Sequence, residues 1–201
     1  MPLSNEPALL CAAFLLYFAT AFVWPSWRVW RRTGINPYVL PSGDDAHGFV
    51  TSGMRGVVAA LFVYVLAQAC WPRVDAALGV IPWLASPVWQ AAGWLGFAIA
   101  MCWTIVAQFQ MGRSWRIGID RAHATGLVTN GLFAVSRNPV FLAMRLCLFS
   151  LVLIRPNALT AGLWLVGDVL MQFQVRLEEA FLRERHGAAY DSYCSRVRRW
   201  L

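Results

Sequence analysis

The chain has 201 residues, of which 59% are hydrophobic and only 13% are charged, and its mean hydropathy is +0.53. A soluble domain of this length carries about a quarter charged residues, so the composition excludes an ordinary soluble domain and indicates an integral membrane protein. The net charge is +7, and all seventeen basic residues are arginines. These arginines flank apolar segments without forming a basic stripe with stacking aromatics, which argues against nucleic-acid binding.

Five apolar segments can be drawn as membrane spans, in chain order residues 7–24, 53–71, 88–109, 140–154 and 158–175. They predict an all-α fold, a polytopic membrane helical bundle of about five transmembrane helices followed by a C-terminal helix. Residues 76–86 are too short to cross alone and contain Pro82. The first segment has Glu6 before it and Arg28 after it, unlike a cleavable signal peptide, so we expect it to remain as a helix.

The arginines are distributed unequally between the two sides of the predicted bundle. Fourteen lie in or beside the loops after the first, third and fifth segments, whereas two, Arg73 and Arg155, lie on the other side. The positive-inside rule therefore predicts an outside N-terminus and a cytoplasmic C-terminus, with the C-terminal helix in the cytoplasm. If the protein is bacterial, the membrane is the inner (plasma) membrane.

Two ionisable residues, Arg145 and Asp168, lie well inside the last two segments. Counted from the turn near Pro156, they are eleven and twelve residues away, about 16–18 Å along their helices, so they lie at matching depth. An isolated charge at that depth is costly, which predicts that they pair. The pair can fix the register of the hairpin, or Arg145 can reach a cavity and orient an anionic substrate group.

Two polar blocks flank this membrane hairpin. The first reads TGLVTNGLF over residues 125–133 and RNPVF over residues 137–141. The second contains the glutamates at 178 and 179 and reads HGAAYDSY over residues 186–193. Because a hairpin returns the chain to the side it left, both blocks are expected at one membrane face. Taken singly, each has a plain reading: Gly131 can be a turn, and Asn138 with Pro139 can begin a helix.

In order and spacing these blocks resemble the isoprenylcysteine carboxyl methyltransferase family, which is related to the phospholipid methyltransferases of membranes. The family's pattern is HTLVTxG followed by Tyr or Phe, then RHPxY, a membrane hairpin, RxxxEE and FGxxYxxY. The resemblance covers about residues 112–201. It divides the chain into residues 1–110, holding three transmembrane helices and their loops, and residues 111–201, a catalytic region of cytoplasmic loop, hairpin and C-terminal helix.

The resemblance implies an S-adenosylmethionine-dependent methyltransferase that modifies a carboxylate, or an amine or thiol, of a lipophilic acceptor. In such a site glycines admit close backbone approach, an aromatic ring can face the sulfonium, and a glutamate can accept hydrogen bonds from the cofactor. The matching cofactor-binding positions are Thr125, Gly126, Leu127, Val128, Phe133, Asn138, Pro139, Val140, Phe141 and Glu178.

Catalytic roles are expected for Arg137, Arg176 and Glu179. A carboxylate acceptor needs only a cationic anchor, such as Arg137 or Arg176, whereas an amine or thiol must lose a proton, and Glu179 is then the predicted base. Gln174 stands where the family has an arginine that helps hold the substrate carboxylate, and Asn138 stands where it has a histidine. We therefore predict substrate contacts for Gln174 and, as a replacement cation, for Arg145.

Other functions fit part of the pattern. A non-catalytic binding or accessory subunit on the same scaffold is the main alternative. A transporter fits less well, because the sequence has no internal repeat. Three histidines and five cysteines lack metal-ligand spacing, so we expect no metal. The expected partners are the membrane itself and a lipophilic small molecule or lipid.

Overall fold

The computed structural model describes residues 6–40, 43–71, 73–118 and 126–201. The first helix is continuous but changes type, from α1 (Glu6–Phe18) through the π-helical η1 (Ala19–Val23) to α2 (Trp24–Thr33). The other long helices are α3 (Ala46–Cys70), α5 (Pro87–Met111), α6 (Pro139–Ile154) and α7 (Ala158–His186), and α8 (Ala188–Arg196) follows them. The short elements are α4 (Val74–Ala77), the 3-10 helices η2 (Gly112–Ser114) and η3 (Gly131–Ala134), and strands β1 (Tyr38–Val39) and β2 (Ile117–Gly118).

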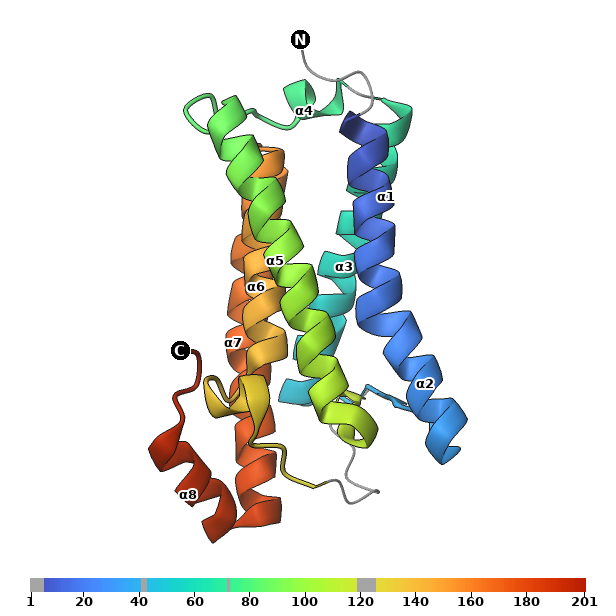
Figure 1. The fold of residues 1–201 in the computed structure, drawn as a ribbon. Coiled ribbons are helices and arrows are strands. Elements are labelled where there is room, and N and C mark those ends of the chain that lie inside the picture. The colour runs from blue at the N-terminus through green and yellow to red at the C-terminus, as the bar shows by residue number, and fades with distance from the viewer. Residues whose placement is uncertain (1–5, 41–42, 72, 119–125) are drawn as a thin grey trace.

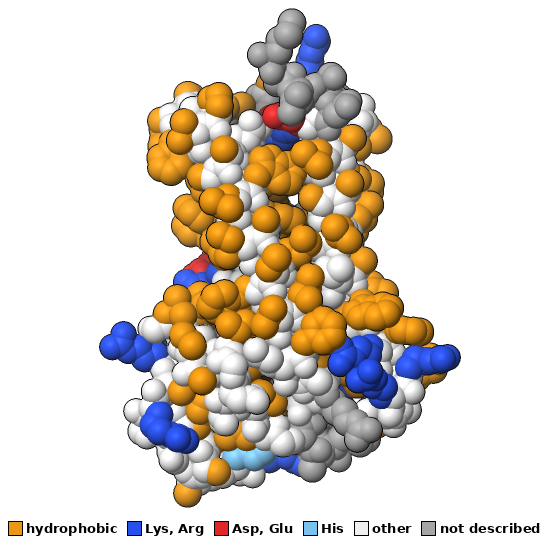
Figure 2. Space-filling view, in the orientation of Figure 1, with side chains coloured by type: hydrophobic (Ala, Val, Ile, Leu, Met, Phe, Trp, Pro, Cys, Tyr) orange, Lys and Arg blue, Asp and Glu red, His pale blue; other side chains and the backbone are white. Residues whose placement is uncertain are grey.

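The predicted all-α membrane bundle is confirmed. Within the described residues, four helical stretches are long and apolar enough to cross a bilayer: Glu6–Thr33, Ala46–Cys70, Pro87–Met111 and Ala158–His186. The shorter α6 lies alongside them (Figure 1). Figure 2 shows hydrophobic side chains covering the middle of the bundle, with arginines gathered around its lower end. Outward-facing residues such as Leu95, Leu165 and Phe173 are more than half exposed, as lipid-facing side chains are.

The bundle packs closely where small residues face a neighbouring helix. α6 lies against both α5 and α7, and α3 lies against α1 and α7. A Cβ added to Gly93 would lie 2.8 Å from Cγ1 of Ile154, and one added to Gly96 would lie 2.5 Å from Oγ of Ser150. These two glycines therefore let α5 approach α6 more closely than any larger residue would allow.

The hairpin between α6 and α7 is fixed at both ends. At the turn, Asn157 caps α7 with its side chain, and its amide also donates to Asp75 (2.8 Å) and to the hydroxyl of Tyr64 (3.0 Å). Deeper in the bundle, Arg145 pairs with Asp168, which confirms the pairing predicted from their depth. The guanidinium of Arg145 also lies 4.4 Å from the ring centre of Trp200, so the C-terminal tail reaches back to α6.

Helix α7 continues well past the last apolar residues. Its 29 residues are about 43 Å long, whereas the hydrocarbon core of a bilayer is roughly 30 Å thick. The apolar part, residues 158–175, accounts for the crossing, and the largely polar residues 176–186 project beyond α5 and α6 at the lower end (Figure 1). Leu127, the start of α6 and α8 lie against this projecting end.

Candidate functional site

A cluster of four polar side chains joins the two sequence blocks at this end of the bundle. Glu179 on α7 is 4% exposed and accepts hydrogen bonds from Arg137, Asn138 and Arg199. We call these four residues the Glu179 cluster. Arg137 and Asn138 come from the first block, Glu179 from the second, and Arg199 from the C-terminal tail, so three separate stretches of the chain meet at one carboxylate.

Arg137 uses its whole guanidinium within this cluster. Its Nε and Nη2 both donate to Oε1 of Glu179 at 3.2 Å, and its Nη1 donates to the backbone oxygens of Cys194 (3.2 Å) and Val197 (3.0 Å). Arg199 approaches the same carboxylate from the tail, with Nη2 donating to Oε2 at 2.8 Å. Both arginines are therefore committed to holding α7, α8 and the tail together.

Asn138 begins α6, with Pro139 in the first turn, as predicted. Its side chain does not cap the helix, although capping by asparagine typically stabilises a helix by about 1 kcal/mol. Nδ2 instead donates to Oε1 of Glu179 (3.1 Å) and to the backbone oxygen of Arg199 (3.3 Å). Asn138, like Arg137, thus links the first block directly to the second.

The C-terminal tail and α8 close over the same region. The backbone N–H of Arg137 donates to the carbonyl of Arg198 (3.0 Å), and the hydroxyl of Tyr193 donates to the carbonyl of Phe133 (2.5 Å). Tyr190, Tyr193 and Val197 form a small buried cluster to which Leu127 and Leu182 add partly buried side chains. This apolar cluster brings Leu127, from the start of the first block, onto the end of α7.

Glu178 and Glu179 lie beyond the membrane-spanning part of α7, and their surroundings shift their pKa values in opposite directions. Burial alone would raise the pKa of Glu179, but the hydrogen bonds and charges of Arg199 and Arg137 outweigh burial and lower it below its ordinary 4.5. Burial raises the pKa of Glu178 to about 7, against a smaller lowering by the hydrogen bond from Gln174. Glu178 therefore holds its proton to a higher pH than Glu179 does.

The glycines of the first block have different surroundings. Gly131 has φ +59°, and a Cβ there would lie 2.3 Å from the side-chain nitrogen of Gln110. Gln110 Oε1 also accepts a hydrogen bond from the backbone of Leu132 (2.8 Å), so α5 holds this turn directly. A Cβ on Gly126 would meet no described atom within 4 Å, which leaves open space beside the backbone there.

The remaining predicted site residues are only partly gathered around these glutamates. Thr125 lies outside the described residues. Phe133 and Pro139 are buried, whereas Val128, Val140 and Phe141 are partly exposed. Arg176 is exposed and donates to Gln172 one turn earlier in its own helix (2.7 and 3.2 Å), and Arg145 is engaged by Asp168. The roles assigned to these residues stay predictions.

Two members of the assembled region were not expected from the sequence. Arg199 was counted among the polar residues after the glutamate pair and as a cytoplasmic charge, without a contact, and no role was predicted for Gln110. The local sequence does not show which contact either residue makes, because each acquires its role only when the tail or the first block folds back onto another helix. The paired arginines before the C-terminal tryptophan were the one available signal.

Comparison with known proteins gives one match. Residues 51–197 match a protein-family model described as a protein of unknown function, DUF1295. The chain belongs to the DUF1295 family. No curated protein and no solved structure matches it. The DUF1295 match runs from within α3 to the end of α8, so it contains both blocks and every member of the Glu179 cluster except Arg199.

Two prominent cavities among the described residues of this DUF1295 protein are not lined by the predicted site residues. A shallow apolar groove lies between α3 and α7, bordered by glycines such as Gly53 and Gly162. A deeper cavity of about 280 Å³ lies between the first helix and the end of α5, with Arg28 and Trp115 in its lining. No three histidine, cysteine, aspartate or glutamate side chains in the described ranges gather as a metal site.

Proposed function

We propose that this protein is a membrane methyltransferase that uses S-adenosylmethionine and acts on a lipophilic acceptor. The observation that supports this most is the hydrogen bond from Asn138 Nδ2 to Glu179 Oε1, 3.1 Å long. It joins the two blocks that resemble the methyltransferase pattern, although forty-one residues separate them. A shared site requires the two blocks to lie within contact distance, and this hydrogen bond meets that requirement.

The residues near this contact have the chemistry that the donor requires. Bound there, S-adenosylmethionine supplies an electrophilic methyl group on a sulfonium. The open space beside Gly126 admits a ligand against the backbone, and Glu178 can accept hydrogen bonds from an amino group or a ribose. Phe141 is partly exposed at the start of α6 and offers an aromatic face to a cation. The Glu179 cluster positions these groups without contacting the ligand itself.

The acceptor nucleophile in this proposal is an amine or a thiol. A carboxylate acceptor would need an unengaged cation, but Arg137 is committed to Glu179 and two carbonyls, and Arg145 to Asp168. Arg176 is exposed and bonds within its own turn. An amine or thiol instead must lose a proton, and Glu178, with a pKa of about 7, is better suited to accept it than Glu179.

A second candidate is the reduction of a lipophilic substrate. The DUF1295 family is commonly associated with steroid 5-alpha reductase-like membrane proteins, and the same lower end of the bundle would then hold a hydride donor. The non-catalytic binding subunit remains the third reading. These three functions differ in the small molecule that the purified protein binds, so one binding comparison separates them.

The test is calorimetric titration of the purified protein with S-adenosylmethionine and, separately, with NADPH, followed by incubation of membranes with methyl-deuterated S-adenosylmethionine. We expect binding of S-adenosylmethionine only and a deuterated methyl group in the lipid extract. Glu178→Gln should abolish transfer, whereas Glu184→Gln, an exposed glutamate on the same helix, should leave it unchanged.

The rate in the wild-type protein should rise as pH increases through about 7, because the base works only when Glu178 is deprotonated. Binding of NADPH in place of S-adenosylmethionine would replace the proposal with the reductase. Binding of neither by folded protein would favour the accessory subunit.

A further inference from the structure

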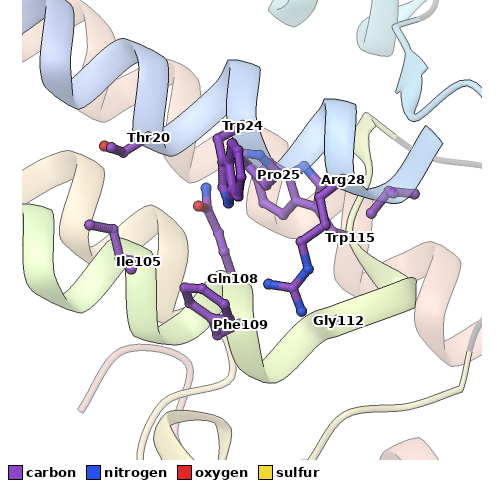
Figure 3. Close-up of a pocket in the computed structure, with 10 residues that line it drawn as sticks. Thr20, Trp24, Pro25, Arg28, Ile105, Gln108, Phe109, Gly112 and Trp115 are labelled. Carbon is purple, nitrogen blue, oxygen red and sulfur yellow. The ribbon is translucent and has the colours of Figure 1, made fainter. Parts of the chain in front are cut away.

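The cavity between the first helix and α5 has features of a binding site of its own. It measures about 280 Å³, and Figure 3 shows the residues that line it. This volume is at the small end for ligand sites, enough for a head group and the first part of a chain. Its walls come from η1 and α2, the last turns of α5 and the residues that follow α5. The lining residues are Thr20, Trp24, Pro25, Arg28, Val29, Ile105, Gln108, Phe109, Gly112 and Trp115.

One buried hydrogen-bond donor in this lining lacks an acceptor among the described residues, and one cation, Arg28, also lines the cavity. The indole Nε1 of Trp115 is buried and has no hydrogen-bond partner there, although the residue is only 5% exposed. A buried N–H without a partner costs roughly 1–3 kcal/mol, so a ligand that supplies an acceptor gains that much. The guanidinium of Arg28 contacts the ring of Phe109, 4.6 Å from its centre, and points toward Gly112 in Figure 3.

A local departure from α-helical geometry lies beside the cavity. In η1 the backbone N–H of Trp24 donates to the carbonyl of Ala19, five residues earlier. The side chain of Gln108, 6% exposed, crosses from α5 to donate to the carbonyl of Ala21 within this segment. π-Helical turns occur frequently at functional sites, and this one lies directly beside the cavity.

The rim of the cavity is apolar and faces outward. Trp24 is 53% exposed and Phe109 is 55% exposed. Tryptophans concentrate at the level of the lipid head groups, so the rim lies where an amphiphile in the bilayer has its polar end. An apolar rim with a cation and an N–H donor inside matches a molecule that has an apolar chain and an anionic head.

We propose that this cavity binds the anionic head of an amphiphile, a carboxylate or a phosphate attached to an apolar chain. The head accepts from the Trp115 indole and the Arg28 guanidinium, and the chain leaves past Trp24 and Phe109 into the bilayer. The head can belong to a membrane phospholipid or to a free lipophilic acid. This binding requires no methyl donor, so it stands or falls independently of the enzymatic function.

The test is native mass spectrometry of the full-length protein in a neutral detergent, titrated with three probes: oleate, phosphatidylglycerol and oleyl alcohol. At least one anionic probe should bind the wild-type protein more tightly than oleyl alcohol. Arg28→Gln should weaken that binding about tenfold or more, because it removes a charge-assisted contact. Trp115→Phe should weaken it by about threefold to tenfold, because it removes the N–H and keeps the ring. Arg32→Gln, an exposed arginine on the same helix outside the cavity, should change it less than twofold, as expected of a roughly negligible surface contribution.

The results either identify the kind of molecule that carries the anionic head or refute the proposal. Binding of oleate alone identifies a lipophilic acid, binding of phosphatidylglycerol alone identifies a bilayer lipid, and binding of both identifies the shared anionic head. Equal losses in Arg28→Gln and Arg32→Gln would overturn the proposal, as would oleyl alcohol binding as tightly as oleate, or no binding at all. If Arg28→Gln does not elute as folded protein, Trp115→Phe is compared with Arg32→Gln instead, and equal losses in these two variants would overturn the proposal.

Discussion

Replacing Glu179 by alanine is the most direct test of how the C-terminal tail is held. The substitution leaves two arginines facing a site from which their shared carboxylate has gone. The side chain of Glu179 is 6% exposed and that of Arg137 is 12% exposed, so this pair is buried. Removing one partner of a buried pair typically costs about 3–5 kcal/mol, because the other charge remains without compensation.

The cost of the Glu179→Ala substitution should lie near the lower limit of that range. Arg137 keeps its two backbone acceptors, the carbonyls of Cys194 and Val197, after the substitution. The side chain of Arg199 is 35% exposed, so solvent screens its charge and its share of the loss is small. We therefore expect the free energy that docks residues 197–201 onto α7 to fall by about 3 kcal/mol.

Hydrogen exchange of the protein in nanodiscs, measured by mass spectrometry, can detect this loss of docking free energy in individual peptides. A loss of about 3 kcal/mol corresponds to roughly a hundredfold faster exchange in peptides from the tail, with little change in α3 or α5. Glu184→Ala, an exposed glutamate five residues along the same helix, is the matched control and should change nothing. Unaltered tail exchange in Glu179→Ala, or equal acceleration in the control, would refute the reasoning.

Three further results are expected. Because the pKa of Glu179 lies below its ordinary 4.5, the stability it contributes is complete above pH 4.5 and is lost as pH falls through the lowered value. The protection factor of the tail amides, which is their exchange rate corrected for the intrinsic rate at each pH, should fall there in the wild type and stay constant with pH in Glu179→Gln. Gly131→Ala places a Cβ at φ +59° and should lower the free energy of unfolding by at least about 1 kcal/mol, seen as an earlier melting transition that is not restored by shortening Gln110. Asp168→Leu should cost about 3 kcal/mol by leaving Arg145 unpaired, whereas the double replacement with Arg145→Leu should melt near the wild type; equal melting of the single and double variants would contradict a pairing role.

The transmembrane architecture could be predicted from the sequence because hydropathy records the bilayer directly. The segment predicted at residues 140–154 appears as α6, Pro139–Ile154, and the segment predicted at 158–175 begins where α7 begins. The helix ends could not be predicted as well, because α7 continues to His186, eleven residues past the predicted end of the segment. Hydropathy marks where the membrane stops and says nothing about whether the backbone stays helical in water.

Within the candidate site, the meeting of the two blocks could be predicted, but the roles of individual side chains could not. The hairpin argument correctly placed Asn138 next to the glutamate pair. The roles of Glu178 and Glu179 depend on which one faces the arginine of a distant tail, a difference of about 100° around α7 that no local pattern encodes. Arg199 approaches Glu179 only because the last residues turn back over α6 and α8.

The π-helical turn in the first helix has a consequence for its register. From Tyr17 onward the inward-facing positions recur every fourth residue, at Ala21, Pro25 and Val29. Those three turns consume twelve residues, whereas an undistorted helix would consume about 10.8. The wide π-helical turn accommodates this extra residue. Deleting one residue there would rotate the rest of the helix by about 100° and point Arg28 away from α5.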